Sequence, residues 1–170
     1  MNTTSVNLQT LSYRETRTYL IALLFIAGNV ILPQLCHLMP QGGLIWLPIY
    51  FFTLVGAYRY GWRVGLLTAI LSPLVNSFAF GMPALAALPI IETKSIILAA
   101  VAGLTATRFN RISLPLIAAV VIVSQLIGGA VEWAYTGSLM AAAQDFRIGF
   151  PGILTQIIGG YLVIRYLANK

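Results

Sequence analysis

The chain has 170 residues, of which 59% are hydrophobic and only 8% are charged, and its mean hydropathy is +0.88. Because soluble domains carry about 25% charged residues, this composition excludes an ordinary soluble protein and predicts an integral membrane protein. The net charge of +6 comes from basic residues that stand singly or in pairs between apolar runs. Such residues are typical topology signals, so nucleic acid is not an expected partner.

The apolar runs predict an all-α fold with six transmembrane helices in one membrane domain, residues 1–170. A helix needs about 20 apolar residues to cross a bilayer. The N-terminal tail, about residues 1–17, is polar and has no basic segment directly before a short apolar run, so no cleaved signal peptide is expected. The predicted helices cover about residues 18–36, 44–58, 64–80, 84–107, 113–135 and 148–167.

The basic residues predict the orientation of this bundle. In a six-helix arrangement nearly all of them fall on one side, and Arg147 alone falls on the other. Lys and Arg accumulate on the cytoplasmic side of membranes. Both termini are therefore predicted to be cytoplasmic, in a multi-pass protein of a bacterial inner membrane. The residues on this side are Arg14, Arg17, Arg59, Arg63, Arg108, Arg111, Arg165 and Lys170.

Two charges interrupt the apolar run LPIIETKSIILAAVAG, which holds Glu92 and Lys94. At about 1.5 Å per residue, Glu92 lies about 12 Å from the outer end of its helix. Charges at such depth are expensive and usually face the bundle interior beside a partner. Residues two apart point to nearly opposite sides of a helix, so each of the two is expected to need its own partner or a wet cavity.

Most other intramembrane polar residues also fall in the outer half of the bundle, above an apolar inner half. This distribution predicts a pocket that opens outward and is closed toward the cytoplasm, and it disfavours a continuous pore. Small residues at Gly128 and Gly129 would allow close approach of a helix or ligand. The predicted binding residues are Glu92, Lys94, Trp133, Glu132, Asn76, His37, Asp145 and Arg147.

Structural roles are the alternative for several polar residues. Asn29, Gln34 and Gln125 are equally compatible with hydrogen bonds between helices. Asp145 and Arg147 could form a local pair or begin a helix. For Glu92 the alternative is a buried pair with a lysine elsewhere in the bundle.

Motifs for catalysis are missing from the sequence. It contains no P-loop, no H-E-x-x-H and no G-x-S-x-G. One cysteine, Cys36, and one histidine, His37, make a poor metal site. Neither enzymatic activity nor a cofactor is expected, and any ATP hydrolysis would belong to a partner subunit.

Two segments give the chain a resemblance to a known family. Residues 47–85, LPIYFFTLVGAYRYGWRVGLLTAILSPLVNSFAFGMPAL, and residues 144–162, QDFRIGFPGILTQIIGGYL, resemble the S components of energy-coupling factor (ECF) transporters. The resemblance implies high-affinity capture of a vitamin or related micronutrient from outside. It also implies docking on a transmembrane coupling subunit driven by two ATPases. Glu92 and Trp133 match the family's helix-four acid and helix-five aromatic, whereas Ala22 and Ala27 depart from its A-x-x-x-A docking spacing.

Two other functions remain open. Residues 52–81 also resemble the cell-shape scaffold protein MreD, which needs no small-molecule pocket. The buried set of Glu92, Lys94 and Glu132 disfavours a pure scaffold. The other alternative is a small secondary transporter with Glu92 as proton carrier, which would predict uptake by this chain alone.

Overall fold

The computed structural model describes residues 4–5, 8 and 10–169, and the described chain is almost entirely helical. Five of its helices are long and apolar enough to cross a membrane. Their boundaries lie within four residues of five of the six predicted helices, which confirms an all-α, multi-pass membrane protein. These helices are α1 (Thr16–Cys36), α4 (Trp62–Phe80), α5 (Leu88–Phe109), α6 (Leu114–Thr136) and α9 (Phe150–Ala168).

The helix predicted near residues 44–58 is interrupted. It consists of α2 (Gly42–Trp46), a 3₁₀ turn η1 (Pro48–Tyr50) and α3 (Phe51–Tyr60). Leu47 adopts a left-handed conformation between α2 and η1, with φ 46°, and Pro48 has no N–H to continue a helix. With 10 residues, α3 is about 15 Å long, so α3 alone is too short to cross a bilayer.

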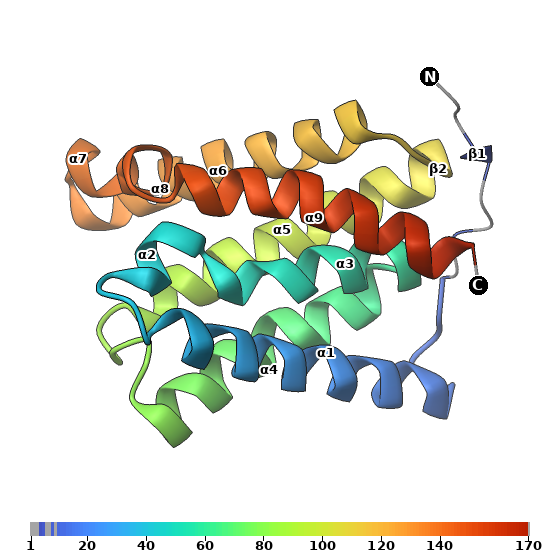
Figure 1. Cartoon of the computed structure of the whole chain (residues 1–170), viewed down its shortest axis with the longest axis horizontal. Helices are drawn as coiled ribbons and strands as arrows, with labels where there is room; N and C mark the ends of the chain where they lie inside the picture. The colour runs from blue at the N-terminus through green and yellow to red at the C-terminus, as the bar shows by residue number, and fades with distance from the viewer. Residues whose placement is uncertain (1–3, 6–7, 9, 170) are drawn as a thin grey trace.

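The short helix α3 is nevertheless the most enclosed element of the fold. All of residues 53–59 are buried, and α3 contacts α1, α4, α5 and α9. Figure 1 shows it in the middle of the bundle. Gly61, at φ 98°, makes the tight turn into α4, and Gly65 lets α4 approach Ala57 so closely that a Cβ there would lie 2.3 Å from the Ala57 Cβ. The interrupted segment therefore supplies the centre around which the long helices pack.

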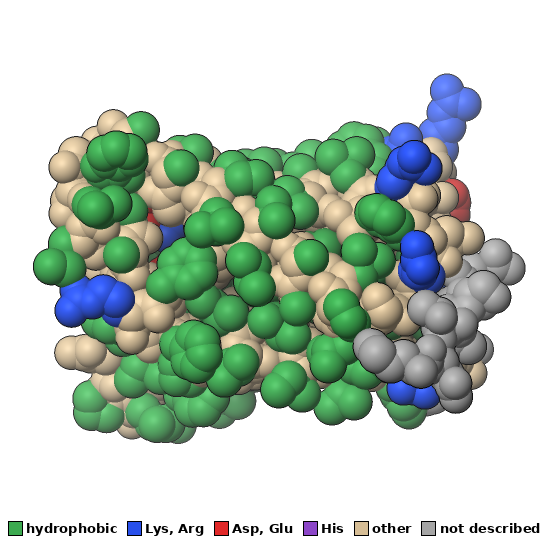
Figure 2. Space-filling view, turned by 90° about the horizontal axis from the view of Figure 1, so that it is seen from above, with side chains coloured by type: hydrophobic (Ala, Val, Ile, Leu, Met, Phe, Trp, Pro, Cys, Tyr) green, Lys and Arg blue, Asp and Glu red, His purple; other side chains and the backbone are tan. Residues whose placement is uncertain are grey.

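The two ends of the bundle differ in character. At one end, β1 (Thr4–Ser5) pairs antiparallel with β2 (Arg111–Ile112), close to the end of α9. Lys and Arg side chains gather there (Figure 2), so we call it the basic end. The opposite end, which we call the cavity end, carries α2, α7 (Leu139–Ala142) and α8 (Gln144–Arg147). Lys170 lies outside the described residues.

On the face drawn in Figure 2, hydrophobic side chains are spread over the middle of the bundle. Leu24 on α1, Leu126 on α6 and Leu162 on α9 are each more than half exposed. Monomeric soluble proteins rarely expose apolar surface of this extent. Exposed apolar side chains of this kind are what a helix bundle presents to lipid.

Candidate functional site

Three buried charged side chains meet at the cavity end. The ammonium Nζ of Lys94 on α5 lies 2.5 Å from Oε2 of Glu132 and 2.7 Å from Oδ2 of Asp145. The three side chains are 8%, 15% and 13% exposed, so most of their hydration has been lost. We call these residues the ion cluster. It carries two negative charges and one positive charge when all three groups are ionised.

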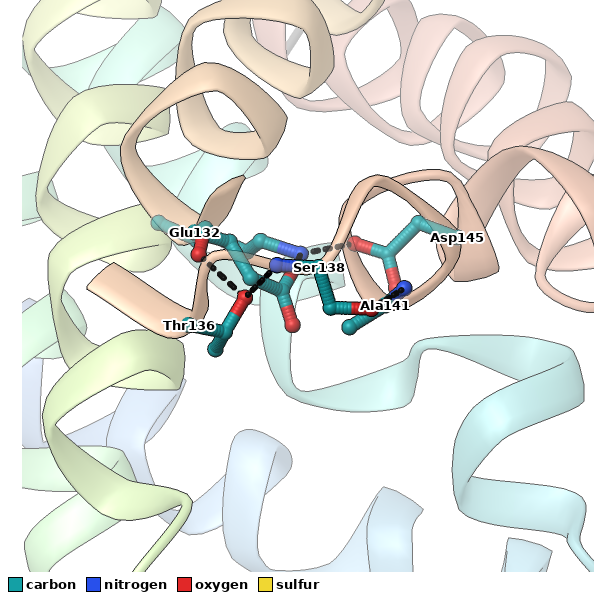
Figure 3. A network of polar contacts seen from close by, with 6 residues as sticks. Glu132, Thr136, Ser138, Ala141 and Asp145 are labelled. Carbon is teal, nitrogen blue, oxygen red and sulfur yellow. Dashed lines mark hydrogen bonds and ion pairs between the residues drawn. The ribbon is translucent and has the colours of Figure 1, made fainter. Parts of the chain in front are cut away.

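The chain turn after α6 positions both carboxylates. Thr136 Oγ1 donates to the Glu132 carbonyl at 2.7 Å, and the Ser138 N–H donates to Thr136 Oγ1 at 3.2 Å. The Ser138 hydroxyl then caps α7 by accepting from the Ala141 N–H at 3.2 Å. Figure 3 shows this ladder of hydrogen bonds, with Glu132 on one side of it and Asp145 on the other.

A glycine on α6 makes room for the Lys94 stem. A Cβ at Gly128 would lie 2.9 Å from Lys94 Cγ, closer than real Cβ contacts allow. Gly128 is one helical turn before Glu132, so the two residues share a face of α6. The lysine thus runs along α6 to reach the carboxylate above it.

The ion cluster forms part of the wall of a cavity of about 220 Å³, here named the outer cavity. The remaining wall is mainly apolar and comes from the α2 region and the first turns of α5, including Leu44, Leu47, Ile90 and Ile91. Small-molecule sites typically combine apolar walls with a few well-placed polar groups. The outer cavity has that composition.

A neighbouring hollow of about 390 Å³, the side cavity, shares five wall residues with the outer cavity. His37 lines it, and His37 Nδ1 lies 2.6 Å from the Pro33 carbonyl oxygen. The shared residues are Gly43, Leu44, Ile49, Ala87 and Ile91. The two hollows are therefore separated only by side chains of the α2 region and α5.

Below the ion cluster, toward the basic end, α5 and α6 pack through apolar side chains. Leu98, one turn below Lys94, is 3% exposed, and Ile117 and Val121 on α6 are fully buried. These residues belong to the main hydrophobic core. On α5 and α6, the buried charged side chains therefore lie nearer the cavity end than the apolar residues packed below them.

Three of the predicted binding residues come together as the ion cluster: Lys94, Glu132 and Asp145. Glu92 is half-buried on α5, lines neither cavity and has no ion-pair partner among the described residues. Asp145 lies in the first turn of α8, which agrees with the alternative of a helix start, and its carboxylate pairs with Lys94 and not, among the described ion pairs, with Arg147. Arg147 is exposed and contacts the sulfur of Met140.

Two other predicted residues lie away from the ion cluster. Trp133 is 53% exposed and lines neither cavity. Asn76 is fully buried and donates to the carbonyls of Asn29 at 2.9 Å and Ser72 at 3.0 Å, while accepting from Gln34 at 3.3 Å. The structural alternative for Asn29 and Gln34 is thus confirmed, and Asn76 belongs to the same network.

Sequence reasoning missed the contribution of the α2 region. Tyr50, Leu44 and Leu47 line the outer cavity, but they look like ordinary apolar residues of a continuous helix. Pro48, which has no N–H to continue a helix, was the signal for a break in that helix. Among the described residues, no three His, Cys, Asp or Glu side chains are grouped so that they could hold a metal ion.

Comparisons with protein-family models, with curated proteins and with solved structures give no match for this chain. The class of protein therefore has to be assigned from the fold and the site of this chain alone. It is a multi-pass helical membrane protein with a buried ion cluster beside cavities at one end of the bundle.

Proposed function

We propose that this chain is the membrane-embedded binding subunit of an ECF-type transporter and captures a vitamin or related micronutrient from outside a bacterial cell. The observation that carries the proposal is the position of the ion cluster in the wall of the outer cavity. Desolvating charged groups is expensive, and apolar side chains of similar volume often stabilise a protein as well or better. A scaffold protein has little need for such a cluster, whereas a binding site uses its charges on a ligand.

The proposed orientation follows from the charges at the two ends. We take α2, η1 and α3 together as a sixth crossing, so that successive crossings alternate in direction. The basic end then faces the cytoplasm, as expected from the positive-inside rule. The cavity end faces outward in the bacterial inner membrane. The chain can therefore bind its ligand there before it docks on a coupling subunit.

Ligand recognition in this scheme combines charge and apolar contact. A polar group of the ligand meets Lys94 or the two carboxylates, and an apolar part rests against residues such as Leu44 and Ile91. A cluster with both signs of charge suits a ligand of mixed polarity. Because apolar residues of α5 and α6 close the space directly below the ion cluster, release into the cell requires a coupling subunit and its two ATPases, and this chain itself hydrolyses nothing.

The test is retention of a small molecule by the purified chain. Wild-type protein and two variants are exposed to a metabolite extract, washed and analysed by mass spectrometry. Glu132→Gln removes a charge from the ion cluster, and Glu15→Gln is the matched control, since Glu15 accepts from the Ser12 N–H at 2.9 Å just before α1. We expect equal retention by wild type and Glu15→Gln and a loss of about 10-fold or more in Glu132→Gln, as for a lost buried charge contact.

Other outcomes point to the other functions. Equal retention by Glu132→Gln contradicts the assigned site. If the wild type retains nothing, a scaffold role of the MreD kind is favoured. Uptake of the retained molecule into vesicles that contain this chain alone would favour a proton-coupled secondary transporter instead.

A further inference from the structure

Two glutamine side chains beneath the ion cluster have no hydrogen-bond partner in the part of the chain that the structure describes. Gln156 on α9 is 1% exposed, and neither its Nε2 nor its Oε1 has a partner among the described residues. Gln125 on α6 is 7% exposed, and its amide makes no hydrogen bond in the described part of the chain either. Both line a space of about 10 Å³, here named the deep cavity.

No described residue that lines the deep cavity hydrogen-bonds to these amides. Ser124 lines it as well, but the Ser124 hydroxyl donates to the Val120 carbonyl at 2.7 Å. Leu98 and Val121 form apolar parts of the wall. Buried side-chain polar atoms nearly always have a partner in native structures, and an unpaired one keeps its full desolvation penalty. Gln156 is therefore able to bind a polar group that enters the deep cavity.

The deep cavity adjoins the outer cavity. Lys94 and Tyr50 line both of them, so these two side chains separate the two spaces. A lysine stem has several rotatable bonds, but here its ammonium is held by Glu132 and Asp145. A ligand that takes over these ion-pair contacts lets the stem shift and connects the outer cavity to the two glutamines.

We propose that the deep cavity is a specificity subsite for a planar, amide-like group that carries a hydrogen-bond donor beside an acceptor. This inference rests on the proposed function. A glutamine amide offers two N–H donors and a carbonyl acceptor, so its complement is a carboxamide, a lactam or a similar ring edge. As it stands, the deep cavity has room for about one water molecule, and the ligand group enters as Lys94 shifts.

Two small probes that differ only at the relevant group test this subsite. Benzamide has a donor beside its carbonyl, whereas acetophenone has a methyl group there. Affinities are measured by ligand-observed NMR on the purified full-length chain. A site built to hydrogen-bond an N–H group rejects the analogue that lacks it, so we expect wild type to prefer benzamide by about 10-fold or more.

Variants locate the source of this preference. Gln156→Leu is expected to reduce it to about 2-fold or less, because the deep pair of hydrogen bonds is lost. Gln34→Leu is the matched control: it makes the same change in α1, where Gln34 donates to Asn76, and it keeps the preference. Gln125→Leu should also weaken the preference, and it replaces Gln156→Leu if thermal unfolding shows that the latter does not fold.

Three results overturn the subsite: equal affinity of wild type for the two probes, no binding of either probe, or a preference that survives in both glutamine variants. Equal affinities would mean that the deep cavity holds a resident water only. If the wild type retains a metabolite but binds benzamide and acetophenone equally well, the subsite is rejected and the proposed function is unaffected. If the wild type retains no metabolite in the retention test, the proposed function itself is rejected.

Discussion

The side chains of Lys94 and Asp145 are joined by a 2.7 Å contact across 51 positions of the sequence. The contact ties α8, in the loop before α9, to the membrane helix α5. Glu132, at the end of α6, reaches the same ammonium. One lysine thereby fixes three segments at the cavity end and sets the shape of the outer cavity.

Removing that lysine should destabilise the fold. Lys94→Met leaves two carboxylates, each less than one-sixth exposed, without their counter-ion. Breaking a buried ion pair from one side costs about 3–5 kcal/mol. The loss is measured by denaturant unfolding of the detergent-solubilised protein.

A neutral triple variant controls for the size of the new side chain. Adding Glu132→Gln and Asp145→Asn to Lys94→Met should restore most of the lost stability, because no unpaired buried charge remains. Wild-type stability in Lys94→Met, or no recovery in the triple variant, would contradict the assignment of a coupled cluster.

Asn29 has a structural role that predicts a separate effect. Its Oδ1 accepts from the Phe52 N–H at 3.1 Å in the first turn of α3, and its Nδ2 donates to Thr53 Oγ1 at 3.1 Å. Asn29→Leu should lower the unfolding free energy by about 1–3 kcal/mol, since it leaves buried polar groups unpaired. Gln34→Leu should cost less, because it removes one part-buried hydrogen bond. Equal effects in the same unfolding assay would contradict this reading of the network.

Gly128→Ala should act on the ion cluster as well as on the fold. The added Cβ meets the flexible Lys94 stem at 2.9 Å, so the lysine has to shift away from α6. We expect the unfolding free energy to fall by about 1–3 kcal/mol, as for other overpacked sites, and retention of the small molecule to weaken. Ala130→Val, on the exposed side of α6, is the control. If both variants retain the molecule as wild type does, the packing of Lys94 on Gly128 is irrelevant to binding.

Membrane orientation can be read from single cysteines in a Cys36→Ser background. Arg147→Cys lies at the cavity end and Arg108→Cys near the end of α5 at the basic end, and both native side chains are exposed. A membrane-impermeant maleimide should label the first in intact cells and the second only after permeabilisation. The reverse pattern, or labelling of both in intact cells, would refute the six-crossing arrangement with cytoplasmic termini.

Hydropathy predicted the long helices well because the membrane imposes their length. It could not predict the interruption at Leu47, because the apolar residues around it fit a continuous helix equally well. Pro48 was the local signal for this interruption. The burial of α3 depends on contacts with four other helices, which no local pattern contains.

The candidate site was predictable in composition but not in pairing. The two-residue spacing correctly indicated that Glu92 and Lys94 do not share a face. It did not say which of them turns inward, although Leu98 and Ala102 continue the buried row below Lys94 at four-residue steps. The contact between Lys94 and Asp145 could not be predicted from the sequence, because it depends on the turn that Thr136 and Ser138 build after α6.

The central claim is that the outer cavity is open to the outside and holds a small molecule. Ala87 lines both the outer and the side cavity, so the most direct measurement is retention after impermeant maleimide labelling of Ala87→Cys in intact cells, again with Cys36→Ser. Leu139→Cys on α7, where the native leucine is 68% exposed and lines neither cavity, is the labelled control. We predict that labelled Ala87→Cys loses the molecule and labelled Leu139→Cys keeps it. Full retention by labelled Ala87→Cys would contradict the account.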